Sequence, residues 1–598
     1  MTELETLPRW QFETILPAVE DPAFARLFAE TVEAVGGLVL LFAEHHVGEA
    51  PTKTIPPSQF EAVLKAYLAV RSNAYLIEAY LECMTAADSR DAAAQARLSE
   101  LQPTVAALSL LQTRLSAWVG EVDVDSLAAA SPAARDHLHF LRQSAVRAQH
   151  LMSPAEEALA ADLVLTGSTA WERLHANLTS QLSVTVRLDG GDRSLPMAAV
   201  RNLAQHPDRD VRQHAYEAET MTWHAVRVPL AAAMNSIKGE VNLLVRRRGW
   251  TSALEATLFE HAIDRPILEA MMTAVEESFP DFRRYLHAKA RRLGLERLAW
   301  WDLNAPVGEN SRPWDFPSAR AFILERFAAF SPVLAGTAAR AFAENWIDAG
   351  PRQGKVGGAF CAWMRGEESR ILSNFLPTHQ GMSTLAHELG HAYHNRTRAA
   401  RSFLQRRTPS TLAETASIFC ETLVDEAAYD SAEPAERLAI VEAFLQSACG
   451  IVVDVAGRFF FEQRVFERRG PRELSPEELC QEMREAQARS YGDGLRPETY
   501  HSYMWAVKPH YYSGSASFYN YPYTFGLLFG LGLFARYRER PGEFVAEYED
   551  LLSRTGMATA AELAHGFGID PGSSAFWRDG LDMVRERIGR FEELSKVK

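Results

Sequence analysis

The stretch MSTLAHELGHAYHNRT, from Met382 to Thr397, contains residues that could bind a metal ion and use it. On a helix with 3.6 residues per turn, His387 and His391 point the same way one turn apart, which suits zinc ligands that must converge on one ion. Glu388 projects about 100° round the helix from His387, beside such an ion, where a general base for a water molecule would lie. The pattern H-E-x-x-H is the signature of zinc peptidases.

The residues after this pattern restrict the class of zinc site. His394 lies about 10.5 Å further along the helix than His387, so we interpret it as a bystander or as a group behind the ligands. A metzincin would have glycine three residues after the second histidine and a third histidine six residues after it. His394 and Thr397 occupy those two places, which excludes that class and moves the third ligand to a later segment.

Glu414 is the candidate for that third ligand, 23 residues after His391. It lies in TPSTLAETASIFCETLVDEAAYD, which we expect to be helical. Thr411 precedes it by three residues, so Glu414 also fits a capping box that only closes a helix start, and both interpretations remain open. Glu421 and Asp425 share a helix face with Glu414, and they either orient the ligand imidazoles or form a solvated face.

The segments AHELGHAYH and LAETASIFCE, in this order and at this spacing, resemble oligoendopeptidase F and its thimet-oligopeptidase relatives. The resemblance runs from about residue 184 to the end of the chain. It implies that His387, His391 and Glu414 are zinc ligands and that Glu388 is the base. It also implies a mainly α fold, a large two-lobed helical zincin with a small β element beside the active-site helix and lobes that enclose a substrate cleft.

Upstream, KVGGAFCAWMRGEESRILSNF predicts two short strands around a turn between Arg365 and Ser369. In the family that the chain resembles, a strand in this position pairs with substrate backbone, a contact that depends little on substrate sequence. Gly357 and Gly358 are therefore candidates for substrate binding, because glycine allows close backbone approach. A purely structural hairpin is the alternative.

Downstream, KPHYYSGSASFYNYPYTFG holds five of the 17 tyrosines of the chain. Hydrogen-bond donors aimed at a developing oxyanion stabilise it, and both histidine and tyrosine can donate. The segment resembles the histidine-and-tyrosine loop of the family, which makes His510 and Tyr519 catalytic candidates and Tyr512 and Tyr523 candidates for substrate binding. An aromatic packing segment is the alternative.

The composition of the 598 residues limits the partners and the compartment. A net charge of −15 argues against nucleic acid and against anionic membranes. The first residues, MTELETLPRWQFETILPAVEDPAF, lack the basic start and apolar core of a signal peptide, and the stretch Phe525–Phe534 is too short to span a bilayer, so we expect a buried helix there. Five scattered cysteines predict reduced thiols and a cytoplasmic protein.

Helical patterns dominate residues 1–195, which are rich in alanine and leucine, and we expect an N-terminal helical region there. VTVRLDGGDRSLPMAAV predicts a hairpin around Asp189–Asp192 that marks the junction with a catalytic zinc-peptidase region at residues 196–598. No linker separates the two regions, so we expect them to pack closely.

We therefore predict a zinc-dependent endopeptidase that hydrolyses short unfolded oligopeptides with a water molecule activated by the metal and a glutamate base. One alternative is a zinc exopeptidase of the dipeptidyl carboxypeptidase type, which needs a group that captures a substrate terminus. A less favoured alternative is an inactive peptide-binding protein, against which the presence of ligands, base and oxyanion donors together argues.

Overall fold

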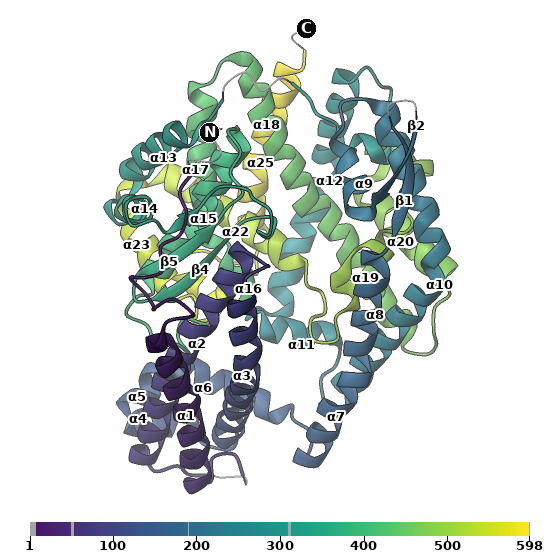
Figure 1. Ribbon diagram of the computed structural model, residues 1–598. Coiled ribbons are helices and arrows are strands. Elements are labelled where there is room, and N and C mark those ends of the chain that lie inside the picture. The colour runs from purple at the N-terminus through teal and green to yellow at the C-terminus, as the bar shows by residue number, and fades with distance from the viewer. Residues whose placement is uncertain (1–6, 50–52, 189–190, 309–312, 597–598) are drawn as a thin grey trace. The chain divides into compact units, whose positions relative to one another are not determined.

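The computed structural model describes residues 7–49, 53–188, 191–308 and 313–596 (Figure 1). The mainly α fold predicted from the sequence is confirmed. Two compact units can be distinguished, each made of three separate stretches of chain. Unit 1 comprises Met1–Leu151, Arg312–Ala427 and Arg536–Gly568, and unit 2 comprises Met152–Ser311, Ala428–Ala535 and Ile569–Lys598.

Unit 1 contains the N-terminal helices, a three-stranded sheet and the helix with the two histidines. Unit 1 takes only the first part of helix α17 (Thr415–Ser431), because its second stretch of chain ends at Ala427. Its elements are α1 (Pro22–Glu44), α2 (Pro57–Ala87), α3 (Ala92–Val119), α4 (Val124–Ala130), α5 (Pro132–Asp136), α6 (Leu138–Gln149), α13 (Phe316–Phe330), α14 (Pro332–Ala343), β3 (Ile347–Asp348), β4 (Phe360–Arg365), β5 (Glu368–Leu372), α15 (His379–Thr397), α16 (Ser410–Ala413), α17 (Thr415–Ser431), α23 (Pro541–Ser553) and α24 (Ala560–Gly566).

Unit 2 contains a β-hairpin and the remaining long helices. Unit 2 takes only the first part of helix α22 (Tyr521–Glu539), because its second stretch of chain ends at Ala535. Its elements are α7 (Pro154–Thr166), α8 (Ser168–Ser180), β1 (Ser183–Leu188), β2 (Gly191–Pro196), α9 (Met197–Asn202), α10 (Arg209–Arg247), α11 (Ala253–Glu260), α12 (Arg265–Arg292), α18 (Pro434–Cys449), α19 (Val455–Arg469), α20 (Pro476–Tyr491), α21 (Met504–Val507), α22 (Tyr521–Glu539) and α25 (Ser574–Leu594).

The sheet of unit 1 lies beside α15 and has the strand order β3-β5-β4. Strands β4 and β5 are antiparallel, as the sequence predicts, whereas the two-residue β3 is too short to show a pattern of its own. Tyr75 of α2 stacks on Trp363 of β4 with ring centroids 5.2 Å apart. Trp10 Nε1 donates a hydrogen bond to the carbonyl of Ile371 at 2.8 Å. The N-terminal helices and the sheet therefore share one core.

This shared core divides the chain differently from the sequence prediction. The boundary expected at residue 195 falls inside unit 2, in β2 of the predicted hairpin. That hairpin is present, with Leu188 opposite Gly191, while Asp189 and Gly190 of its turn lie outside the described residues. Because side-chain packing joins residues before 151 to the sheet after 346, each unit is built from segments that are not consecutive in the chain.

Two buried ion pairs connect the helices of unit 2. Lys238 of α10 lies 2.7 Å from Glu462 of α19, and their side chains are 0% and 2% exposed. Lys289 of α12 lies 2.5 Å from Glu442 of α18. Removing one partner of such a pair leaves an uncompensated buried charge, which is costly.

Two apolar stretches of unit 2 lie in its interior. Among the described residues, the helical run Pro434–Arg469 is long and apolar enough to cross a membrane by length and composition alone. However, 56% of its most apolar window is buried inside the protein, and Glu442 and Glu462 on this run form the ion pairs described above. The stretch Phe525–Phe534 lies in α22 and is buried, as predicted.

We predict that Lys238→Met destabilises the protein by about 3–5 kcal/mol, because Glu462 would remain buried without a counter-charge. The double variant Lys238→Met/Glu462→Leu should recover most of that loss. Arg142→Met removes the exposed Arg142–Asp125 pair and should change stability by less than about 1 kcal/mol. Denaturant unfolding measures all three, and a Lys238→Met protein as stable as the parent would contradict the assigned cost.

Candidate active site

Helix α15 positions the two histidines of the H-E-x-x-H pattern. It begins after Thr378, whose side chain caps the helix by accepting a hydrogen bond from the Gly381 N–H at 3.1 Å. Leu385, Leu389 and Ala392 form a fully buried stripe along it, as their spacing predicts. This stripe fixes the rotation of the helix, so the histidines must point away from that part of the core.

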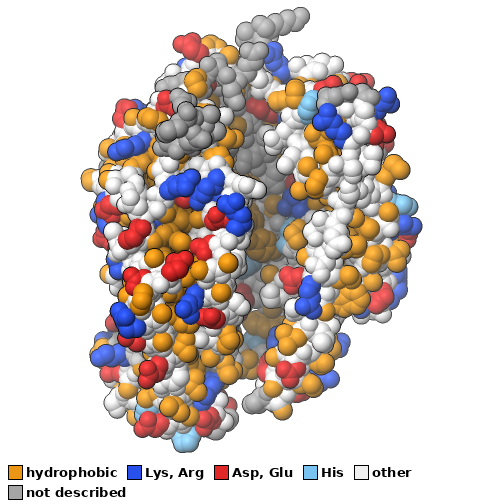
Figure 2. Space-filling view, in the orientation of Figure 1, with side chains coloured by type: hydrophobic (Ala, Val, Ile, Leu, Met, Phe, Trp, Pro, Cys, Tyr) orange, Lys and Arg blue, Asp and Glu red, His pale blue; other side chains and the backbone are white. Residues whose placement is uncertain are grey.

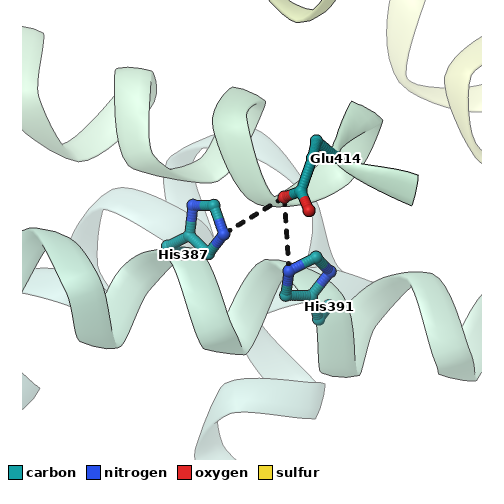
Figure 3. Close-up of side chains that lie close together, drawn as sticks. All are labelled: His387, His391 and Glu414. Atoms are coloured by element: carbon teal, nitrogen blue, oxygen red, sulfur yellow. Dashed lines mark ion pairs between the residues drawn. The ribbon is translucent and has the colours of Figure 1, made fainter. Parts of the chain in front are cut away.

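His387, His391 and Glu414 converge in space (Figure 3). The distances from Glu414 Oε2 are 3.2 Å to His387 Nε2 and 3.4 Å to His391 Nε2. The candidate ligand atoms of all three residues lie within 4.8 Å of one another. Helix α16 starts at Ser410 after Pro409, so Thr411 lies inside this helix and is not the N-cap that a capping box with Glu414 requires. Its carboxylate faces the histidines instead.

A glycine makes this convergence possible. A Cβ atom added at Gly390 would lie 2.7 Å from the carbonyl oxygen of Ala416 and 2.7 Å from Cα of Ser417, closer than real Cβ atoms come. The backbones of α15 and α17 therefore touch at this point, one residue before His391 and two residues after Glu414.

Side chains of α17 also hold the candidate ligands in place. His387 Nδ1 donates a hydrogen bond to Glu421 Oε2 at 3.0 Å, which turns Nε2 toward Glu414. Ser417 Oγ donates a hydrogen bond to Glu414 Oε2 at 2.7 Å. Such outer partners fix the tautomer and orientation of metal-binding groups. The orienting position predicted for Glu421 matches this geometry, whereas Asp425 Oδ1 lies 3.2 Å from His379 Nε2, a residue outside the candidate ligand set.

The electrostatics of the cluster favour a positive charge. Burial acts to lower the pKa of His387, but hydrogen bonds to Glu414 and Glu421 outweigh it and raise that pKa to about 10. Burial acts to raise the pKa of Glu414, but the hydrogen bond with His387, the charges of both histidines and the hydrogen bond from Ser417 together outweigh it and lower that pKa to about 2. Burial and the charge of His387 lower the pKa of His391 to about 4. The carboxylates of Glu414 and Glu421 thus stabilise the protonated, positively charged form of His387. A bound metal cation would supply the positive charge in place of that proton.

Glu388 lies next to this cluster and takes no part in it. Its side chain is 5% exposed, and Oε2 has no hydrogen-bond partner among the described residues. Burial raises the pKa of Glu388 to about 7, with the charge of His387 acting against this shift. A buried carboxyl with a free oxygen beside a cation site is suited to accept a proton.

His394 is a structural residue. It is buried, and its Nε2 lies 2.8 Å from the hydroxyl of Thr555. This position agrees with its interpretation as a bystander.

Gly357 and Gly358 lie in the bend that precedes β4, an edge strand of the sheet. Gly358 has a φ of +82°, and Asn374 Nδ2 donates hydrogen bonds to the carbonyl groups of Val356 and Gly358, each at 2.9 Å. A Cβ atom at either glycine would meet no described atom. The positive φ explains Gly358, and substrate binding at both glycines remains a prediction.

His510, Tyr519 and Tyr523 lie together in unit 2. The rings of His510 and Tyr519 stack with centroids 6.0 Å apart, and the Tyr523 hydroxyl donates to the Tyr519 hydroxyl at 3.3 Å. Tyr519 and Tyr523 are exposed, and His510 Nε2 has no hydrogen-bond partner among the described residues. Burial lowers the pKa of His510 to about 3, helped by the charges of Arg458 and Lys508, so this imidazole is neutral.

Tyr512 requires a correction. Its side chain is 0% exposed and stacks on His175 with ring centroids 3.9 Å apart. A fully buried ring cannot contact a substrate, so the substrate contact predicted for Tyr512 is wrong and the aromatic-packing alternative holds at this position.

Comparison with known proteins gives the family. Residues 202–583 match the model described as Peptidase family M3, and residues 119–183 match the model described as Oligopeptidase F. The chain belongs to peptidase family M3. The M3 chain is 23% identical over 482 residues to an oligoendopeptidase F homolog of Lactococcus lactis subsp. lactis (strain IL1403), covering 80% of this chain and 78% of the relative.

Two further similarities extend over most of the M3 chain. Group B oligopeptidase PepB of Streptococcus agalactiae serotype III (strain NEM316) is 25% identical over 486 residues, which cover 80% of each chain. The crystal structure of oligoendopeptidase-F from Enterococcus faecium has a TM-score of 0.70 at 19% identity and covers 96% of this chain and 99% of that chain. This structural similarity supports the mainly α fold.

Peptidases of family M3 are metallopeptidases, so membership implies a bound metal ion. The residues present fit one, because His387, His391 and Glu414 offer two imidazole nitrogens and a carboxylate oxygen within 4.8 Å of one another. Three protein ligands with one open position are typical of catalytic metal sites. The role of Gly390 was not predicted from the sequence, although a glycine inside an otherwise regular helix pattern is a signal of close packing.

We predict that Gly390→Ala lowers metal retention and peptidase activity together, because the new Cβ atom pushes α17 and Glu414 away from the histidines. Gly589→Ala on α25 is the matched control, since its Cβ would meet nothing within 4 Å. Metal analysis after dialysis, beside activity, tests this. Full metal content in Gly390→Ala would show that the helix contact does not position Glu414.

Proposed function

We propose that this M3 peptidase is a zinc-dependent endopeptidase that hydrolyses short, unfolded oligopeptides. The observation that carries the proposal is the convergence of His387, His391 and Glu414 beside the buried carboxyl of Glu388. Relatives named oligoendopeptidase F over most of the chain length support the endopeptidase assignment. The two-histidine, one-carboxylate donor set supports zinc.

In this mechanism each residue has a separate role. His387, His391 and Glu414 would hold the ion, which when bound polarises the scissile carbonyl and lowers the pKa of a water molecule. Glu388 takes a proton from the attacking water and passes it to the leaving amine. Glu421 keeps His387 in the tautomer whose Nε2 is free to bind.

We assign the stabilisation of the carbonyl oxygen to His510 and Tyr519 of unit 2. The support is chemical: both side chains can donate a hydrogen bond, they stack on each other, and the Tyr519 side chain is exposed. Tyr523 donates to the Tyr519 hydroxyl, which leaves the proton of Tyr519 free for another acceptor. Donors of this kind act mainly when charge develops on the oxygen.

We predict that Glu388→Gln keeps its zinc and loses hydrolysis by several orders of magnitude, because the amide cannot accept the proton. Glu414→Gln should instead lose zinc as well as activity. Metal content and turnover of a quenched-fluorescence peptide separate the two variants. Turnover retained in Glu388→Gln would assign the base elsewhere, and full zinc in Glu414→Gln would assign the third ligand elsewhere.

We predict that Tyr519→Phe lowers kcat by about 100- to 1000-fold with little change in KM, because one donor to the transition state is lost. Tyr512→Phe is the matched control on the same segment: its buried hydroxyl serves packing, so kcat should stay near the parent value. Steady-state kinetics and thermal unfolding of both variants test this. A normal kcat in Tyr519→Phe would remove this hydroxyl from the mechanism.

The lengths of the products distinguish an endopeptidase from the exopeptidase alternative. Internal cleavage of a peptide library, measured by mass spectrometry with and without a chelator, supports the proposal. Uniform release of dipeptides from the C-terminus would favour the exopeptidase. No metal-dependent cleavage at all would favour an inactive peptide-binding protein.

A further inference from the structure

A cavity of about 240 Å³ in unit 2 has a positively charged wall. Its lining includes three cationic side chains, Arg201 of α9, Arg458 of α19 and Lys508 after α21, and one carboxylate, Asp454. The whole chain carries a net charge of −15, and acidic and basic side chains are interspersed on the face seen in Figure 2. The side chains that line this cavity therefore carry more positive than negative charge, in contrast to the chain as a whole.

The charges in this wall are not balanced. Arg458 pairs with Asp454, and Arg201 Nη1 lies 3.3 Å from Glu219 Oε1. Lys508 forms no ion pair with any described residue. Burial and the neighbouring Arg458 guanidinium lower the pKa of Lys508 to about 8, because together they outweigh the opposing charges of Asp454 and Glu219.

Hydrogen-bond donors in the wall are also left over. Arg458 Nε is buried and has no hydrogen-bond partner in the described structure. The Oδ1 atom of Asn304 accepts a hydrogen bond from Gln446 at 2.8 Å, which leaves the amide N–H groups of Asn304 as donors. The side chain of Arg201 is 32% exposed, so solvent and small solutes can reach this side of the cavity.

The backbone around the cavity departs from regular helix. Residues Gly450–Asp454 form a π-helical turn between α18 and α19, and this turn places Asp454 and Arg458 in the wall. Such turns are frequent at functional sites. Lys508 comes two residues before His510, so the cavity adjoins the segment to which we assign oxyanion stabilisation.

We propose that this cavity binds a small oxyanion, a carboxylate or a phosphate, through Lys508, Arg458 and Arg201. The negative charge of the ligand balances the ammonium charge of Lys508. Its oxygens accept hydrogen bonds from the donors of Arg458 and Asn304 that have no acceptor in the described structure. A carboxylate can come from a free small anion or from the C-terminus of a peptide. The second source rests on the proposed peptidase function, and the first does not.

Calorimetric titration of the metal-loaded protein with sodium acetate, and separately with inorganic phosphate, tests the site. The parent protein and the control variant Arg464→Gln should bind at least one of the two anions saturably. Arg464 lies on α19, as Arg458 does, but it does not line the cavity. Lys508→Gln should weaken this binding at least about tenfold, and Lys508→Arg should restore most of it. Without added anion, Lys508→Gln should unfold no earlier than the parent, because it removes an unpaired charge.

A second arm identifies the source of the carboxylate. Peptides of one sequence with a free or an amidated C-terminus compete with the bound anion in the Glu388→Gln protein. Stronger competition by the free carboxylate assigns the site to a substrate terminus, and equal competition assigns it to a free anion. Absence of saturable acetate and phosphate binding in the parent, or affinity unchanged in Lys508→Gln, overturns the proposal whatever the outcome for peptide hydrolysis.

Discussion

The close contact between α15 and α17 at Gly390 is the constraint on which the candidate active site depends. Two histidines four residues apart on one helix supply only half of a metal site, and the third donor must come from another element. Glu414 reaches them because glycine lets the backbone of Ser417 come against α15. The buried leucine stripe of α15 and the sheet beside it then hold the histidine face in one orientation.

That contact has an electrostatic consequence. It brings Glu414 and Glu421 to the two ring nitrogens of His387, so two carboxylates share one imidazole. The cluster carries more negative than positive charge unless a cation is present, and this excess supports the assignment of a metal ion. Glu388 stays outside the hydrogen-bonded cluster, which keeps one oxygen free to take part in proton transfer.

The sequence predicted the features that depend on local spacing. Helical periodicity predicted that His387 and His391 share one face of α15. It named Glu421 and Asp425 alike as candidates to orient an imidazole, and only tertiary structure separates them, because Glu421 bonds to His387 while Asp425 lies beside His379. The strand pair around Gly366 also followed from local pattern. The assembly of unit 1 from three separate stretches did not, because Tyr75 and Trp363 meet only through tertiary packing. The same reason explains the error at Tyr512, whose burial against His175 has no signal in its own segment.

Anomalous diffraction at the zinc edge, on crystals of the purified protein, tests the central claim most directly. We predict one peak at roughly 2.0–2.2 Å from His387 Nε2, His391 Nε2 and a carboxylate oxygen of Glu414, with Glu421 hydrogen-bonded to the other ring nitrogen of His387. A peak coordinated by Glu421 in place of Glu414, or located away from α15, would contradict it.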